Sequence, residues 1–338
     1  MSRFAYVTFI IRNDSYLPGA LVFAYALRLQ KTEHDLVCIV SEQVSEQAID
    51  ALRELYDDVL VIDEVFVPHK RRHERQDRPF LFSRFNAFRL GPDGDLGRTY
   101  DKILIADCDV LPLRDYDTLF QVPAPAGIIN EKKEYCMEYV NNVYTIPSSV
   151  DEDGTWIWHR IYHDVPHGTL IPQHITDRVT DDPENMGVNA SLYLFEPSMA
   201  MYHDIIDDVL DDDAVDTISS YNWPEMQYIT KKLSGTWHNI DLRYSSFNGY
   251  PKVDVLYGIH FAGLKPWAIN NKSVKSFAKF EDYQLWFHTY QRMMTDHPVF
   301  TRVGRLRRIA EFVDSLLIQD KYRFRKRDLP FLQHFFRS

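Results

Sequence analysis

Cysteine is scarce in this 338-residue chain, which contains only Cys38, Cys108 and Cys136. Three cysteines at wide spacing form neither a disulfide framework nor a CxxC metal-binding pair. This excludes the small disulfide-stapled scaffolds and the common zinc folds. The same scarcity is typical of proteins from a reducing compartment.

Long apolar runs and an excess of basic residues are also lacking. No run of about 18 apolar residues occurs, and the N-terminus has neither a charged region nor a small-residue cleavage site. We therefore expect a cytoplasmic protein. Lysine and arginine number 38 against 49 acids, which gives a net charge of −11. This balance argues against a nucleic-acid partner, because such binding depends on cations that neutralise phosphates.

The chain does have the material for a large core, since 45% of its residues are hydrophobic and 14% are aromatic. This composition argues against disorder and fits one large domain with an appended tail. We assign residues 1–298 to the main domain and residues 299–338 to the tail, where basic residues are concentrated. Within the domain, residues 131–182 form an irregular insertion rich in Trp, His, Pro and Asp.

Apolar, β-branched segments alternate with helical patterns along the first 110 residues. We predict strands at 4–11, 35–40, 59–62, 102–106, 190–195 and 253–261, and helices at 17–29, 45–56, 80–90, 198–211 and 223–233. Strands separated by helices indicate a Rossmann-like α/β domain with a mostly parallel sheet. Ligands bind such sheets beyond the carboxyl ends of the strands, which directs attention to residues 13–16 and 107–109.

Asp107 and Asp109 stand directly after the predicted strand 102–106. On an extended backbone, residues i and i+2 point the same way, so both carboxylates can reach one cation. Carboxylate oxygens suit Mg²⁺ or Mn²⁺, which neutralise the phosphates of a bound nucleotide. The alternative interpretation is that the two aspartates only end the strand and solvate the following turn.

A second motif, GIHFAGLKPW at residues 258–267, ends a late predicted strand. The imidazole of His260 is a suitable third ligand for Mn²⁺ beside two carboxylates. Gly263 allows the backbone to approach a diphosphate, and Lys265 supplies the counter-charge. The alternative is a buried core histidine followed by a turn that ends at Pro266.

Together these motifs resemble glycosyltransferase family 8, the family that includes glycogenin. The resemblance runs from about residue 4 to residue 267, with a gap in the middle, and it includes the segment Asn13–Tyr16. It implies a single nucleotide-sugar-binding domain of the GT-A type, followed here by a basic helical C-terminal extension. The loop before Asn13 is one residue longer than in glycogenin.

The resemblance also implies which residues bind the donor and which act on it. Thr8 and Asn13 would contact the nucleoside, and Tyr16 would stack on the uracil. Gln227, Glu225 and Arg84 are implied beside the anomeric carbon, although Glu225 is displaced by one position and Met226 is an alternative occupant of the acidic place. The implied metal ligands are Asp107, Asp109 and His260. The full implied donor set is Thr8, Asn13, Tyr16, Arg78, Arg84, Asp107, Cys108, Asp109, Asn185, Gly187, His260, Gly263 and Lys265.

The resemblance to family 8 also implies a reaction. A sugar would be transferred with retention from a UDP-sugar, such as UDP-glucose, to a hydroxyl of a carbohydrate or protein acceptor. The implied cofactor is Mn²⁺ or alternatively Mg²⁺. Tyr244 and Tyr250 lie roughly where glycogenin carries its self-modified tyrosine, in a loose local alignment. Two other interpretations stay open. One is a catalytically impaired nucleotide-sugar-binding protein, and the other is a haloacid-dehalogenase-type phosphatase with Asp107 as its nucleophile.

Two further segments lie outside these motifs. The segment 156–174, with two tryptophans and four histidines, is expected to form a lid on the acceptor side, and its histidine spacing matches no zinc pattern. The tail predicts an amphipathic helix that packs on the core or on the second subunit of a homodimer, or that attaches to a membrane surface. Its apolar positions are Val303, Leu306, Ile309, Phe312 and Leu316.

Overall fold

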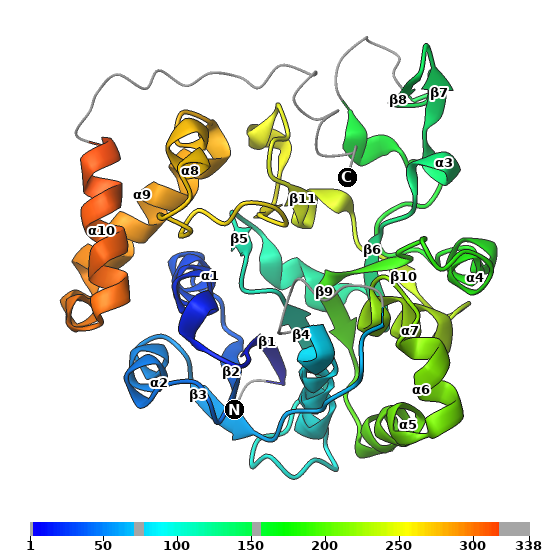
Figure 1. Cartoon of the computed structure of the whole chain (residues 1–338), viewed down its shortest axis with the longest axis horizontal. Helices are drawn as coiled ribbons and strands as arrows, with labels where there is room; N and C mark the ends of the chain where they lie inside the picture. Colours follow the sequence, from blue (N-terminus) through cyan, green and yellow to red (C-terminus); the bar gives the residue numbers. More distant parts are fainter. Residues whose placement is uncertain (1–2, 71–77, 151–156, 318–338) are drawn as a thin grey trace.

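The computed structural model describes residues 3–70, 78–150 and 157–317. This part contains a seven-stranded sheet in the order β10-β6-β9-β4-β1-β2-β3 (Figure 1). Neighbouring strands are parallel except where β9 pairs with β4 and β6, so the predicted mostly parallel sheet is confirmed. The strands are β1 (Phe4–Ile10), β2 (Asp35–Ser41), β3 (Asp58–Ile62), β4 (Lys102–Ala106), β6 (Ala126–Ile129), β9 (Val188–Phe195) and β10 (His238–Asn239).

The residues of β1 alternate between two cores, one on each face of the sheet. Ala5 and Val7 belong to one core, and Tyr6 and Ile10 to the other, as the two-residue period of a strand requires. The core that contains Tyr6 is covered by α1 (Leu17–Leu29), α2 (Glu46–Arg53), α9 (Glu281–Asp296) and α10 (Gly304–Leu317). Figure 1 shows α9, in orange, beside α1, with α10 packed against α9.

The second core is covered by α4 (Gln173–Asp181), α5 (Met199–Leu210), α7 (Pro224–Lys232) and a 3-10 helix over Arg78–Leu90. The helix that we predicted over 80–90 is present, and it is a 3-10 helix. Phe82, Phe85 and Phe88 are all buried at a spacing of three residues. That spacing matches the three residues per turn of a 3-10 helix, so one face presents all three rings to the core.

A second, three-stranded sheet consists of β11 (Ser246–Phe247), β12 (Gly258–His260) and β5 (Val110–Pro112). The predicted strand 253–261 was wrong in its first half, which forms a 3-10 turn over Val253–Val255. Two backbone hydrogen bonds close this turn, from Val255 to Lys252 and from Leu256 to Val253. The β5–β12 pair matters for the site, because it joins segments about 150 residues apart in sequence.

The insertion 131–182 is partly regular. It contains α3 (Lys133–Cys136), the hairpin of β7 (Glu138–Val140) and β8 (Val143–Thr145), a 3-10 turn over Trp158–Arg160, and α4. The hairpin turn uses Asn141 and Asn142 with φ of 50° and 62°, the conformation that favours asparagine in two-residue loops. In Figure 1 this hairpin projects at the upper right. Trp156 of the expected lid lies outside the described residues.

The tail helix α10 is anchored in the core that contains Tyr6. Val303, Leu306, Ile309 and Leu316 are at most 9% exposed and belong to that core. Its apolar face therefore packs on the core of this chain. Residues 318–338, with the remaining basic positions, lie outside the described residues. No helix in the described ranges is long and apolar enough to span a bilayer.

Gly187→Ala is expected to lower the free energy of unfolding by about 2–3 kcal/mol, the sum of a left-handed backbone cost and overpacking. Gly187 has φ +78°, and an added Cβ would lie 2.6 Å from Thr230 Cγ2 and 2.7 Å from Val179 Cγ1. Urea unfolding measures the effect. Gly97→Ala is the matched control, since Gly97 also has φ +78° but would have nothing within 4 Å. Equal losses in both variants would contradict the packing contribution.

Candidate active site

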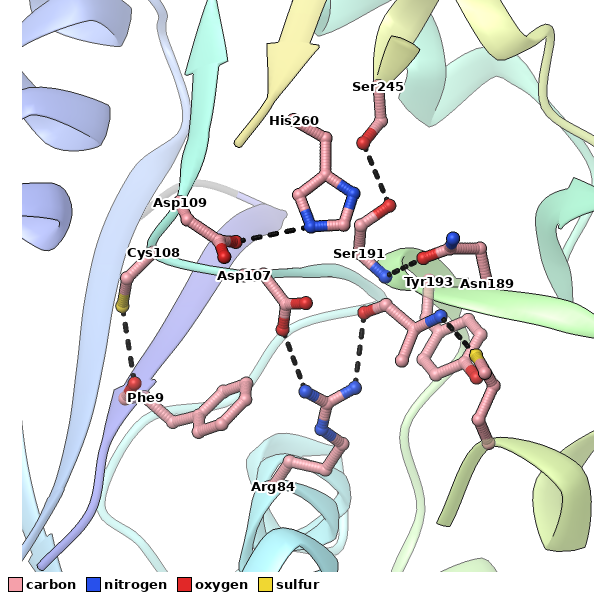
Figure 2. Close-up of polar contacts among 12 residues, drawn as sticks. Phe9, Arg84, Asp107, Cys108, Asp109, Asn189, Ser191, Tyr193, Ser245 and His260 are labelled. Carbon is pink, nitrogen blue, oxygen red and sulfur yellow. Dashed lines mark hydrogen bonds and ion pairs between the residues drawn. The ribbon is translucent and has the colours of Figure 1, made fainter. Parts of the chain in front are cut away.

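Asp107, Asp109 and His260 converge at the junction of the two sheets (Figure 2). Asp107 follows β4, Asp109 precedes β5, and His260 ends β12, where it pairs in register with Val110. The backbone N–H of Phe261 donates to the Asp109 carbonyl at 2.9 Å. One potential ligand atom from each of the three side chains lies within 4.8 Å of the others, so their predicted convergence is confirmed.

The backbone that carries the two aspartates differs from the expected one. Asp107 to Asp109 form a turn between β4 and β5, with the N–H of Val110 donating to the Asp107 carbonyl at 3.2 Å. The carboxylates face the same space because of this turn, and not because of the alternation of an extended strand. Figure 2 shows both carboxylates directed toward the space below the His260 ring.

The electrostatic environments of the two aspartates differ. Burial raises the pKa of Asp107 above its ordinary value, although the charge of Arg84 opposes the shift. For Asp109, burial would also raise the pKa, but Lys265 and His260 outweigh it and hold that pKa well below the ordinary value. These surroundings therefore favour the charged form of Asp109 more than that of Asp107.

The composition of this triad fits a divalent metal ion. Oxygen ligands with one imidazole suit Mn²⁺, and carboxylate oxygens suit Mg²⁺. The Asp109 Oδ1 and His260 Nδ1 atoms are buried without a hydrogen bond among the described residues, and the only charged contact of Asp109 Oδ1 in that part of the chain is His260 Nε2 at 3.4 Å. A buried polar atom without a partner is costly, and coordination of a cation would relieve that cost at Asp109.

Arg84 and Lys265 each support one aspartate. Arg84 is buried on the 3-10 helix, donates to Asp107 Oδ1 at 2.7 Å and to the Ala190 carbonyl at 3.1 Å, and lies over the Phe9 ring. Its guanidinium therefore positions Asp107. The Lys265 ammonium pairs with Asp109 and donates to the Phe261 carbonyl at 2.7 Å.

The three predicted motifs meet at Gly19 of α1. A Cβ at this position would lie 2.3 Å from the Cys108 carbonyl oxygen and 2.5 Å from Trp267 Cη2. Trp267 in turn packs edge-on against Tyr16, with ring centroids 5.8 Å apart. The Lys265 ammonium lies 5.9 Å from the centre of the Tyr16 ring. The first helix, the aspartate turn and the late motif are therefore packed directly against one another.

Four other residues of the predicted donor set are either bonded within the protein or exposed. Thr8 is fully buried and donates to the Tyr56 hydroxyl at 2.9 Å, so its hydroxyl belongs to the core. The buried Cys108 thiol donates to the Phe9 carbonyl at 3.2 Å. Asn13 is exposed and caps the following 3-10 turn, and Gly263 is exposed in the late motif.

Several residues predicted to lie beside the donor sugar instead form hydrogen bonds or packing contacts within the protein. The Gln227 side chain accepts from the backbone N–H of Trp223 and donates to the Pro183 carbonyl, both at 2.8 Å. Asn185 is fully buried and accepts from the backbone N–H of Lys132 at 2.9 Å. Arg78 is buried over the Trp223 ring. Gly187 packs against Thr230.

Glu225 is placed differently from Gln227, although both lie on α7. Its side chain is 6% exposed, and its charge is among those that raise the pKa of Arg84, against the opposing effect of burial. Glu225 is therefore electrostatically coupled to the residue that holds Asp107. Of the two candidates from this segment, Glu225 is the one whose charge acts on Arg84.

Sequence reasoning missed a cluster at the carboxyl ends of β1 and β3. Arg12 has φ +69° and pairs with Glu64 at 3.0 Å, while its guanidinium lies 4.3 Å from the centre of the Phe80 ring. The N–H of Asn13 donates back to the Ile11 carbonyl at 2.9 Å, which makes a strained three-residue turn at Arg12. The sequence feature that indicates this turn is the one-residue extension of the loop before Asn13.

The two tyrosines near the position of the self-modified tyrosine of glycogenin are buried. Tyr244 is 5% exposed and stacks on Tyr257, with ring centroids 4.5 Å apart. Tyr250 is also 5% exposed, and its hydroxyl bonds His159 Nδ1 at 2.5 Å. Neither hydroxyl is presented to a donor in this conformation.

Comparison with known proteins adds to this geometry. No protein-family model matches the chain. Uncharacterized protein R707 of Acanthamoeba polyphaga mimivirus is 27% identical over 316 residues, which cover 88% of this chain and 96% of that protein. Glycogenin-1 of Caenorhabditis elegans is 34% identical over 123 residues, which cover 35% of this chain and 27% of glycogenin-1. That second similarity therefore spans about a quarter of the relative's length.

Among solved structures, the galactosyltransferase LgtC, determined in complex with donor and acceptor sugar analogues, aligns with a TM-score of 0.53 and 13% identity. The alignment covers 84% of this chain and 94% of that one. At this identity the likeness concerns the fold, which is the GT-A fold. Sequence similarity to glycogenin and this fold together identify the chain as a glycosyltransferase that resembles family 8.

Proposed function

We propose that this glycosyltransferase transfers a sugar from a UDP-sugar donor, with retention at the anomeric carbon, in a reaction that depends on Mn²⁺ or Mg²⁺. The observation that carries the proposal is the convergence of Asp107, Asp109 and His260, with Lys265 beside them. A divalent ion bound there would supply positive charge to the donor diphosphate and its departing oxygen. The similarity to glycogenin supports a UDP-sugar as donor.

The chain's own residues support this chemistry around the ligand set. Lys265 supplies a cation where negative charge develops on the departing UDP. Arg84 fixes the orientation of Asp107 through its bonds to that carboxylate and to the Ala190 carbonyl. Tyr16, half-buried against Trp267, is the proposed stacking partner for the uracil. Together they would hold the nucleotide along the edge of the sheet.

On the sugar side we propose Glu225 as the carboxylate that stabilises the cationic character of the reacting sugar. Its burial and its coupling to Arg84 support this role. Gln227 and Asn185 are proposed as supports that hold the surrounding backbone, because their amides bond Trp223 and Lys132. Thr8, whose hydroxyl is buried in the core, is not proposed as a side-chain contact to the nucleoside.

The two alternative functions have less support. A haloacid-dehalogenase-type nucleophile at Asp107 does not account for the convergence of Asp109 and His260 on the same point, nor for the GT-A fold. An impaired binding protein would require loss of a metal ligand or of the supporting cations. Asp107, Asp109, His260 and Lys265 all lie together in this chain.

The test incubates the protein with Mn²⁺ and a panel of UDP-sugars, with and without simple acceptors, and measures released UDP. Calorimetry measures UDP binding in parallel. We expect one donor to release UDP in a metal-dependent manner that EDTA abolishes. Measurable UDP binding without release from any donor would instead support the impaired binding protein. Absence of both binding and release would overturn the proposed function.

A further inference from the structure

A cavity of about 430 Å³ lies beside the metal-ligand triad. Its walls come from the end of β6, the segment 158–167, the loop 239–243 and β11. We call it the insertion cavity, because residues of the 131–182 segment form one side of it. A volume in this range is typical of a site for a small organic ligand.

Two wall residues connect the insertion cavity to the triad. Phe247 stacks on His260, with ring centroids 5.6 Å apart and planes at 27°. Asn189 accepts from the N–H of Ser191 at 2.8 Å, a bond visible in Figure 2. The Ser191 carbonyl accepts from the N–H of Asp107 at 3.0 Å. A ligand in the cavity would therefore lie next to the metal-ligand triad.

The two carboxylates in the cavity wall are already engaged by arginines. Glu131 accepts from Arg178 at 2.9 Å through each of its oxygens, and from the Tyr162 hydroxyl at 3.1 Å. Asp241 accepts from Arg243 at 3.0 and 2.8 Å. A carboxylate is an acceptor-only group, so these bonds use the main acceptors that could otherwise receive hydroxyl groups of a neutral sugar.

Three other polar side chains of the wall, Arg160, His167 and Asn189, offer donors. Arg160 is exposed, and its guanidinium has no hydrogen bond or ion pair with any residue that the structure describes. His167 Nδ1 accepts from the N–H of Asp241 at 3.1 Å, so the ring proton lies on Nε2. The Asn189 oxygen is engaged by Ser191, which leaves its NH₂ group as a donor. A cationic donor beside engaged carboxylates favours a ligand that carries an anionic, acceptor-only group.

We propose that the insertion cavity binds the acceptor of the reaction, and that this acceptor is a saccharide bearing a carboxylate or phosphate group that pairs with Arg160. This rests on the proposed function. In the transfer, the bond between the anomeric carbon and the UDP oxygen breaks and its electron pair leaves with UDP. An acceptor hydroxyl oxygen forms the new bond to that carbon, and its proton passes to the departing diphosphate.

The test compares matched acceptors with the donor that the UDP-sugar panel selects. Glucose, glucuronic acid and glucose 6-phosphate present a neutral group, a carboxylate and a phosphate on one ring. We expect kcat/KM for at least one anionic acceptor to exceed that for glucose tenfold or more. Arg160→Ala should remove this preference, Arg160→Lys should restore part of it, and both should bind UDP as the unmodified protein does. Arg53→Ala, at a surface arginine paired with Asp50, is the control that should change nothing.

Several outcomes would overturn the acceptor assignment while leaving the proposed function intact. Equal use of neutral and anionic acceptors is one, and an Arg160→Ala variant that keeps the anionic preference is another. If Arg160→Ala instead raises KM only for UDP-glucuronate as donor, the anion belongs to the donor sugar and the assignment is wrong. Failure to bind UDP or to release it from any donor would count against the proposed function itself.

Discussion

Asp109→Asn is expected to lower metal-dependent glycosyl transfer at least about a hundredfold, more than the loss typical of a residue that only orients a metal ligand. The amide keeps the shape of the side chain but removes the charge that pairs with Lys265 and faces His260. A neutral amide oxygen is a weaker ligand for Mn²⁺ or Mg²⁺ than a carboxylate. The measurement is UDP release at saturating donor, together with Mn²⁺-dependent UDP binding by calorimetry.

Asp101→Asn is the matched control for this substitution. Asp101 also pairs with a cation, Arg3, but both side chains are largely exposed, so the same chemical change should leave transfer unaltered. Thermal unfolding separates function from folding, because ligand that binds only the native state raises its unfolding temperature. Mn²⁺ with UDP should raise that temperature for the unmodified protein and for Asp101→Asn, but not for Asp109→Asn. Full activity of Asp109→Asn would remove the metal site from the mechanism.

The strand end, the two aspartates and the first helix of the site could be predicted from the sequence, because each follows from a local sequence pattern. A buried apolar run followed by Asp107 and Asp109 marks the end of a strand, and carboxyl ends of strands meet at one edge of a sheet. The helix 17–29 was predicted with its observed bounds. His260 was predicted as the third ligand from its residue type and from resemblance. The β5–β12 pairing that brings it to Asp109 has no local sequence signal.

The sugar side could not be predicted equally well, because residue type and spacing do not say which way a side chain on a helix points. Gln227 follows the start of α7 by a few residues, and a glutamine there can reach back to the N-cap backbone N–H, as in a capping box. While the Gln227 side chain makes this local hydrogen bond, it is held away from a catalytic role beside the donor sugar. Glu225 lies two residues earlier on α7, and its charge is among those that raise the pKa of Arg84 against the opposing effect of burial.

Gly19→Ala is expected to cost about 3 kcal/mol of unfolding free energy, at the upper end of typical overpacking losses. Helix propensity alone would predict the opposite sign, because alanine is favoured over glycine by about 1 kcal/mol inside a helix. The contact decides it, since the added Cβ would lie 2.3 Å from the Cys108 carbonyl oxygen, a backbone atom that no side-chain rotation can move. Relief therefore requires α1 and the aspartate turn to separate.

That separation would reach the active site, because Cys108 lies between the two aspartates of the metal-ligand triad. We expect at least a tenfold loss of Mn²⁺-dependent UDP affinity, measured by calorimetry at a temperature where the variant remains folded. Gly304→Ala, at the first residue of α10 with nothing within 4 Å of an added Cβ, should keep both stability and affinity. If Gly19→Ala lost stability but bound UDP normally, α1 would support the fold without positioning the aspartates. If affinity fell as expected, the close packing at Gly19 would be what keeps the first helix, the aspartate turn and Trp267 in the positions needed to bind the donor.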